Sequence, residues 1–308
     1  MTRQRTIRFC ASITGTGLHT GRRARLAFRP APPDSGIVFI RTDMRGAPKL
    51  RASALALKDS RRRTILRKGG MEIHTAEHLM AALSGLSIDN IAVEIDNLEV
   101  PGLDGSAKEF VSVLRAAGFE EQDAPRRFVE IARPIICADE GSGSSIQIVP
   151  DEKFMVEYFL DYGHPLLKEQ WSDITLDGSD ESQKFFENNI APARTFCLKS
   201  EAMMLLRFGF GKGASLENTL VIGEDGPVGN TFRFPDEPAR HKLLDLIGDL
   251  YVLGRRIKGR ITAKKSGHRL NSIFIKRLQK ESINGGDRSD SEDYAASISD
   301  ALGRQDHI

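Results

Sequence analysis

In the first third of the chain, the spacing of apolar residues first predicts β-strands and further along also predicts helices. Strand-type runs occur in "TIRFCASI", "RARLAFRP" and "SGIVFIRTD", and the turn-rich stretch "TGTGLHTG" separates the first two. A helix is predicted in "HTAEHLMAALSGL", with Thr75 as its N-cap and Gly85 as its C-terminal glycine. The strand "NIAVEID" and a helix in "DGSAKEFVSVLRAAG", with Ser106 and Glu109 at capping-box spacing, complete this part.

The same kind of pattern restarts after "EEQDAPRRF", which we interpret as a linker because it is charged and has little apolar content. Strands are predicted in "RFVEIARPIICAD", "SSIQIVP", "KFMVEYFLDYG", "NTLVIG" and "RIKGRITAKKS". "KSEAMMLLRFGFG" is predicted as a short amphipathic helix or an insert. Two longer helices lie in "DEPARHKLLDLIGDLYVLG", with Asp236 as N-cap and Pro238 in the first turn, and in "SGHRLNSIFIKRLQK".

The two halves resemble each other, which suggests an internal repeat. Both "EHLMAALSGLSIDNIAVEI" and "RHKLLDLIGDLYVLGRRIKGRITA" place a histidine near a helix start and follow it with apolar turns, a glycine and a strand. We therefore predict an α+β fold of two similar domains, residues 1–124 and 128–281, followed by a polar, mobile tail over 282–308. If these domains face each other, His78 and His241 meet between them.

Composition and charge narrow the class of protein. The chain has 308 residues, of which 40% are hydrophobic and 28% charged, as expected for a soluble protein of two domains. Its net charge of +2 gives no overall field for nucleic acid or a membrane surface. The three cysteines are far apart, and the N-terminus lacks the apolar core of a signal peptide. We expect a cytoplasmic protein that binds no nucleic acid and does not insert stably into a membrane.

Two helices carry the candidate metal ligands. His241 and Asp245 are four residues apart, so both side chains lie on one helix face and can chelate one ion. Glu77 precedes His78, an arrangement in which a carboxylate can act as a base beside a metal ligand. The alternative is an ordinary His–Asp pair on a solvated helix face, with a glutamate that the helix dipole favours.

Three further positions could support catalysis. His268 follows a glycine in "KKSGHRLN", and Asp249, one turn further along the same polar stripe, could hold it in its cationic form. Thr195 in "APARTFCLKS" could donate its hydroxyl to an oxyanion, and Phe196 follows it. His19 lies in the glycine-flanked loop "GLHTG". Taken alone, His268 could simply be the first residue of a helix, Thr195 a strand residue and His19 part of an ordinary turn.

Three weaker signals remain open. "RRRTILRKGG" is typical of a solvated hairpin, although its charges could also meet a phosphate. "AMMLLRFGF" has the composition of an apolar groove or of an ordinary core helix. "GFGKG" is glycine-rich but has the wrong context for a phosphate-binding loop.

Over residues 3 to 280, the chain resembles the UDP-3-O-acyl-N-acetylglucosamine deacetylases, the zinc enzymes of lipid A biosynthesis in Gram-negative bacteria. The matching segments, in family order, are "TGTGLHTG", "TAEHLMAALSGLSIDNIAVEID", "LDGSAKEFV", "PARTF", "RHKLLDLIGDLYVLG" and "KSGH". The resemblance implies two similar two-layer α/β sandwich domains with the active site between them. It also implies a basic insert near 58–73, and an insert near 195–222 that forms the wall of a passage for the fatty-acyl chain.

The resemblance implies a role for each candidate residue. The ligands of one zinc ion, which iron could replace, fall on His78, His241 and Asp245. The general base falls on Glu77, the catalytic histidine on His268 with Asp249 as its support, and the oxyanion-binding hydroxyl on Thr195. The substrate-binding positions fall on Lys242 and Lys265 for the diphosphate, on Tyr162 for the uridine, and on Phe196 and His19.

The implied reaction is the committed step of lipid A biosynthesis. A monomer would hydrolyse the N-acetyl group of UDP-3-O-(3-hydroxyacyl)-N-acetylglucosamine to the free amine and acetate. A general base and a general acid would give a bell-shaped pH–rate profile. The competing interpretation is an α+β protein that binds RNA through the basic hairpin and holds no metal. A zinc peptidase is a third possibility, but the sequence has no HExxH motif.

Overall fold

Each half of the chain forms a five-stranded sheet, and the two sheets have the same strand order. In this computed structural model, which describes residues 2–60 and 62–282, the orders are β2-β3-β9-β4-β5 and β12-β13-β19-β14-β15. The first sheet contains β2 (Ala11–Thr16), β3 (Arg23–Pro30), β9 (Ile91–Ile95), β4 (Ile37–Arg41) and β5 (Lys49–Arg51). The second contains β12 (Ile135–Asp139), β13 (Ser144–Val149), β19 (Gly259–Lys264), β14 (Phe154–Leu160) and β15 (Gln170–Thr175).

Strand directions match as well as strand order. In each sheet the central strand, β9 or β19, pairs antiparallel with one neighbour and parallel with the other. All remaining pairs within the two sheets are antiparallel. The prediction of an α+β fold is confirmed, and the matching topology agrees with the repeat inferred from the sequence. The division into two domains stays a prediction.

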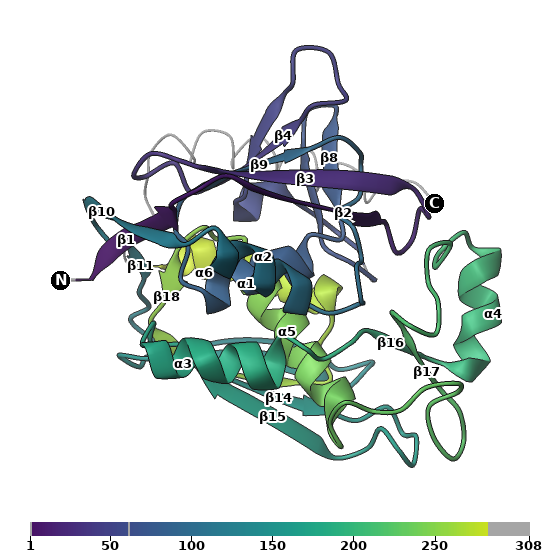
Figure 1. Ribbon diagram of the computed structural model, residues 1–308. Helices are drawn as coiled ribbons and strands as arrows, with labels where there is room; N and C mark the ends of the chain where they lie inside the picture. Colours follow the sequence, from purple (N-terminus) through teal and green to yellow (C-terminus); the bar gives the residue numbers. More distant parts are fainter. Residues whose placement is uncertain (1, 61, 283–308) are drawn as a thin grey trace, which may run out of the picture.

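The main helices lie between the two sheets (Figure 1). They are α1 (Glu77–Gly85), α2 (Lys108–Ala116), α5 (Glu237–Tyr251) and α6 (His268–Glu281). α1 and α5 cross at the centre, where a Cβ atom added to Gly248 would overlap the backbone carbonyl of Glu77. Glycine at this position therefore permits the close approach of the two helices. Every residue of α1 is buried, and so is every residue of α5 except Arg240 and Lys242.

Smaller elements complete the molecule. β1 (Arg3–Ile7) pairs antiparallel with β10 (Phe119–Pro125), so the segment predicted as a linker is mostly a strand. That prediction was wrong because a charged edge strand with few apolar residues resembles a loop in sequence. β11 (Phe128–Val129) pairs parallel with β18 (Arg256–Ile257). Helix α3 (Asp180–Phe185) continues into the π-helix η2 (Phe186–Ile190).

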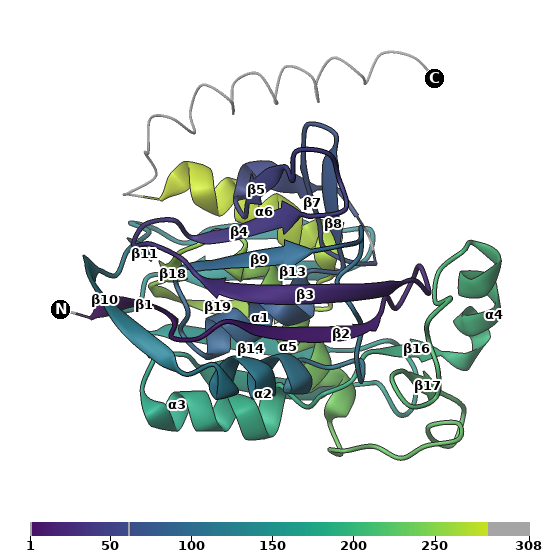
Figure 2. The ribbon, with the colours of Figure 1, turned by 45° about the horizontal axis from the view of Figure 1, so that its top comes forward.

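Both predicted inserts have secondary structure of their own. The basic insert near 58–73 forms an antiparallel sheet of β6 (Leu57–Lys58), β7 (Ile65–Lys68) and β8 (Met71–His74), and η1 (Ala54–Ala56) precedes it. The second insert contains β16 (Phe196–Leu198), α4 (Lys199–Arg207) and β17 (Leu220–Ile222), with the two strands parallel. Figure 2 shows α4 at the edge of the molecule, away from the stacked sheets.

The structure confirms some of the predicted helix ends and contradicts others. Thr75 does not cap α1, because it has φ 57° and its hydroxyl donates to Glu99 instead. Gly85 is the last residue within α1, and Ser106 bonds the Lys108 amide rather than forming a capping box with Glu109. α5 begins after Asp236 with Pro238 in its first turn, as predicted, but the Asp236 side chain accepts a hydrogen bond from Arg240 and does not cap the helix. No helix within 2–60 and 62–282 is long and apolar enough to cross a bilayer. The tail, predicted to be mobile, lies outside the described residues from 283 onwards.

Candidate metal centre and active site

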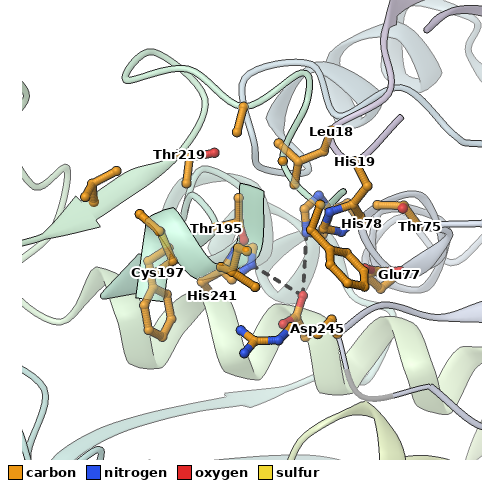
Figure 3. A pocket seen from close by; sticks show the side chains of 18 of the residues that line it. Leu18, His19, Thr75, Glu77, His78, Thr195, Cys197, Thr219, His241 and Asp245 are labelled. Carbon is orange, nitrogen blue, oxygen red and sulfur yellow. Dashed lines mark ion pairs between the residues drawn. The ribbon is translucent and has the colours of Figure 1, made fainter. Parts of the chain in front are cut away.

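Three buried side chains converge where α1 crosses α5. Oδ1 of Asp245 lies 3.5 Å from Nε2 of His78 and 3.4 Å from Nε2 of His241 (Figure 3). The two imidazole rings stand nearly perpendicular, with their centroids 5.0 Å apart. One potential ligand atom from each residue lies within 4.8 Å of the others. The sequence predicted this triad, and the crossing of the two helices brings its members together.

The triad has the properties of a cation site. Oδ1 of Asp245 is buried and has no hydrogen-bond partner, whereas Oδ2 accepts a hydrogen bond from Lys242 at 2.8 Å. Nδ1 of His241 lies 3.0 Å from the Ala193 carbonyl, which can only accept, so Nδ1 carries the proton and Nε2 presents its lone pair to the centre. A buried carboxylate oxygen without a donor is costly, and a cation would satisfy it. Two imidazole nitrogens and one carboxylate oxygen suit Zn²⁺ and similar metals.

Electrostatics favour the metal-binding state of Asp245 and His241, whereas those around His78 favour its protonated form. Burial opposes the charge of Asp245, but Lys242 and His241 hold its pKa well below the usual value. Burial lowers the pKa of His241 to about 4, so this ring is neutral at physiological pH. Burial would also lower the pKa of His78, but the neighbouring carboxylate of Asp245 raises it. Binding of a metal ion to His78 would therefore compete with protonation of its ring.

Glu77 lies beside the triad in a dry environment. Its side chain is buried, and burial raises the pKa of its carboxyl group above the usual value. Oε2 accepts a hydrogen bond from the Thr64 amide at 2.9 Å, which fixes the carboxylate. A carboxylate whose pKa is raised toward neutrality is a stronger base than one in water.

His268 forms a second buried charge pair behind the triad. Its Nδ1 lies 2.8 Å from Oδ2 of Asp249, and its Nε2 lies 3.7 Å from Oδ2 of Asp245. Burial opposes the cationic ring, but the charge and hydrogen bond of Asp249 raise the pKa of His268 to about 9. Asn271 donates to the same Asp249 oxygen at 2.8 Å, and the Thr64 hydroxyl donates to the other one. His268 is therefore a protonated ring at neutral pH.

A single cavity of about 380 Å³ joins these groups to an apolar region. The polar residues of its lining include Glu77, His78, Thr195, His241, Lys242, Asp245 and His268. The apolar residues of its lining include Leu18, Ala202, Leu205, Leu206, Phe210, Leu216 and Val221, most of which come from the second insert. Figure 3 shows His78, His241 and Asp245 facing one another, with Glu77 and Thr195 beside them. The site can thus hold a polar reacting group and an apolar chain at the same time.

Four of the remaining predicted residues line the same cavity. Thr195 is half-buried, and its amide donates to the Gly105 carbonyl at 2.8 Å. The Phe196 ring lies 6.3 Å from that of His241 and 5.5 Å from that of Tyr162. His19 packs edge-on against the Phe210 ring at 5.4 Å, and burial lowers its pKa to about 4. Its loop is held by Glu99, which accepts hydrogen bonds from the amides of His19 and Thr20.

Lys265 is the one predicted site residue that stays apart. It is exposed, has φ 54° and does not line the cavity, although it lies three residues before His268. Asp249 also lies outside the cavity wall, because it contacts the site through His268.

Two residues that hold the site were not anticipated. Asn271 is three residues after His268 on the same helix, so helical spacing could have indicated it. Thr64 lies in the basic hairpin and reaches both Glu77 and Asp249. No sequence pattern could have indicated Thr64, because Asp249 is 185 residues away along the chain.

Comparison with known proteins agrees with this geometry. Residues 4–280 match the family of UDP-3-O-acyl N-acetylglycosamine deacetylases. Two similar curated proteins are the UDP-3-O-acyl-N-acetylglucosamine deacetylases of Coxiella burnetii strains Dugway 5J108-111 and RSA 331 / Henzerling II. Each is 39% identical to this chain over 279 residues, which cover 90% of both proteins. The chain therefore belongs to the UDP-3-O-acyl-N-acetylglucosamine deacetylase family.

Proposed function

We propose that this chain hydrolyses the N-acetyl group of a UDP-3-O-(3-hydroxyacyl)-N-acetylglucosamine at the centre formed by His78, His241 and Asp245. The observation that carries this proposal is the convergence of the triad, the buried Glu77 and the His268–Asp249 pair on one cavity. This arrangement also favours a metal-dependent hydrolase over the RNA-binding alternative, because its charged groups are buried around a cavity rather than spread over a surface.

We assign one zinc ion to the triad, and iron could occupy the same ligands. Zinc, when bound, lowers the pKa of a coordinated water and polarises the carbonyl that is attacked. The protein would hold the ion through Nε2 of each histidine and Oδ1 of Asp245, the atoms that face one another.

Glu77 would remove the proton from the attacking water. Its buried carboxylate is held by the Thr64 amide, and burial has raised its pKa, so it has both the position and the basicity of a general base. Proton transfer to Glu77 also relieves a buried negative charge, which lowers the cost of the step.

His268 would then give a proton to the departing nitrogen. Asp249 holds the ring through Nδ1, which leaves Nε2 free to donate. With a pKa of about 9 the ring is cationic at neutral pH, as a general acid requires. The Thr195 hydroxyl would donate to the oxyanion that forms at the acetyl carbonyl.

The two ends of the substrate would meet two kinds of surface. Lys242 and Lys265 would contact the diphosphate as point charges, and Tyr162, with Phe196 and His19, would contact the nucleotide and sugar. The acyl chain would lie against the apolar residues of the cavity lining, to which α4 contributes Leu205 and Leu206. The halves 1–124 and 128–281 would then be two domains with the reaction between them, in a cytoplasmic monomer.

A mass-spectrometric deacetylation assay with zinc-loaded protein tests this function. We expect the wild type to release acetate from the acylated UDP-sugar, and Glu77→Gln to keep its zinc but lose most of kcat. Wild-type protein that binds no metal, or Glu77→Gln with near-native kcat, would contradict the proposal.

A further inference from the structure

Arg194 and Glu237 form a buried ion pair beside the metal centre that has no place in the reaction above. Nε of Arg194 lies 2.9 Å from Oε1 of Glu237, and the second guanidinium nitrogen, Nη2, lies 3.2 Å from Oε2. The two side chains are 7% and 0% exposed. Arg194 belongs to the "PARTF" segment, whose threonine is a site residue, while Glu237 is the first residue of α5.

Backbone groups extend this pair into a network. Glu237 accepts hydrogen bonds from the amides of Arg194 at 3.0 Å and Arg233 at 2.6 Å. Nη2 of Arg194 also donates to the Thr231 carbonyl at 2.6 Å. Both oxygens of the carboxylate are therefore satisfied, and its charge lies at the positive end of the α5 dipole. The network fastens residues 193–195 to the first turn of α5.

Both neighbours of Arg194 belong to the site. The Ala193 carbonyl accepts the hydrogen bond from Nδ1 of His241 at 3.0 Å, and Thr195 lines the cavity. His241 lies four residues after Glu237, so both side chains lie on the same side of α5. α5 thus carries His241 and, one turn earlier, Glu237. The Glu237 carboxylate holds the segment whose Ala193 carbonyl bonds to His241.

We propose that Arg194 and Glu237 are positioning residues for the metal centre. Their ion pair holds the Ala193 carbonyl against His241, and this contact fixes the tautomer and orientation of the histidine ring. The same ion pair fixes the position of Thr195 in the cavity. This inference rests on the proposed function, because it assigns a role relative to the metal triad and the oxyanion-binding hydroxyl.

Stability alone does not account for such a pair. Removing two charges from water is costly, and a well-packed apolar pair of similar size often stabilises a fold at least as well. Hydrogen-bonded partners of metal ligands, by contrast, typically change metal affinity about 10–100-fold when they are removed. The buried two-point ion pair between Arg194 and Glu237 therefore contributes mainly by orienting the residues next to Arg194.

The test replaces both charges at once, so that neither is left buried without its partner. We expect the double variant R194M/E237L, in metal-free form, to bind Zn²⁺ about 10–100-fold more weakly in competition with a chromophoric chelator. At saturating zinc, its kcat should fall while KM for the acylated UDP-sugar changes little. The single variant Glu237→Gln keeps the shape of the side chain and should lose less zinc affinity and less kcat. It replaces the double variant in this test if the double variant does not fold.

A second buried pair offers a matched control. Arg126 and Asp89 lie 2.9 Å apart with side chains 7% and 11% exposed, and neither lines the cavity. The variant R126M/D89L should leave zinc affinity unchanged, whatever the direction of its effect on the melting temperature. Equal loss of zinc affinity in both double variants would assign the effect to stability and overturn the inference. If R194M/E237L and Glu237→Gln both keep wild-type zinc affinity and kcat, the positioning role is also overturned. That result would leave the proposed function unaffected. A wild type without zinc would overturn both together.

Discussion

Helices α5 and α4 both line the cavity, and each inverts the usual distribution of polar and apolar residues. α5 buries His241, Asp245 and Asp249 in the middle of the molecule. α4 buries none of its residues, and Met203 and Leu206 are 65% and 54% exposed. Buried charge and exposed apolar surface are both unfavourable for folding. Each inversion therefore indicates a site, and the two sites differ in kind.

This difference between α5 and α4 corresponds to two tasks, the chemical reaction and the binding of the acyl chain of the substrate. On α5 each residue to which we assign a metal-binding or supporting role has a hydrogen-bond partner: Ala193 for His241, Lys242 for Asp245, and Asn271 for Asp249. On α4 flexible leucine and methionine side chains offer an adaptable wall with little packing behind it. Bond cleavage needs fixed geometry, whereas an acyl chain needs apolar area, and the cavity places one beside the other.

The largest effect is expected from removing a ligand on α5. Asp245→Ala should abolish metal binding and activity, because two imidazoles and no carboxylate leave an incomplete site. Metal content by mass spectrometry and the deacetylation rate measure this. A variant that retains one zinc per chain would show that Asp245 is not a ligand.

A smaller loss is expected one turn further along the same helix. Asp249→Ala should keep the metal but lower kcat about 100-fold or more, because His268 loses the carboxylate that holds it in its cationic form. Metal content and kcat are measured together. If this variant loses zinc as completely as Asp245→Ala, the division of roles along α5 is wrong.

On α4 the expected effect concerns only the acyl chain. Leu205→Ser should reduce the preference for acylated over acyl-free UDP-sugar about tenfold in kcat/KM, since each buried CH₂ group contributes about 0.8 kcal/mol. The ratio of kcat/KM for the two substrates measures this. An unchanged ratio would remove α4 from the acyl-binding surface.

The smallest effect is expected on the outer surface of α4. Met203→Ser should change the free energy of unfolding by no more than about 0.5 kcal/mol, because the side chain is exposed. Leu246→Ala on α5, at a fully buried position, should cost about 2–5 kcal/mol. Urea denaturation of both variants compares the two helices directly, and equal costs would contradict the contrast between them.

The sequence predicted α5 well but left its polar stripe ambiguous. Its apolar period and the proline after Asp236 indicated the helix, and the four-residue spacing indicated chelation. Whether that stripe faced water depended on α1, whose crossing at Gly248 buries it. Burial arises from tertiary packing, which one helix in isolation does not encode. The same reason hides Thr64, which meets Asp249 only in the folded chain.

Edges of the fold were harder to predict than its centre. Helix and strand patterns are strong where one face packs on a core, as in both sheets and in α1. β10 has only partly buried and exposed residues, so no alternation distinguished it from a linker. Thr75 resembled an N-cap, but its hydroxyl found Glu99, which no local pattern reveals.

The two sheets of identical strand order also bear on how such a centre could have arisen. His78 and Gly85 on α1 have the same spacing as His241 and Gly248 on α5. Four residues after the histidine, however, α1 has Ala82 and α5 has Asp245. If both halves descend from one duplicated ancestor, each kept a histidine and a close-packing glycine while only one acquired the carboxylate. Neither half retains a complete set of ligands, so the two copies became mutually dependent and could no longer evolve apart.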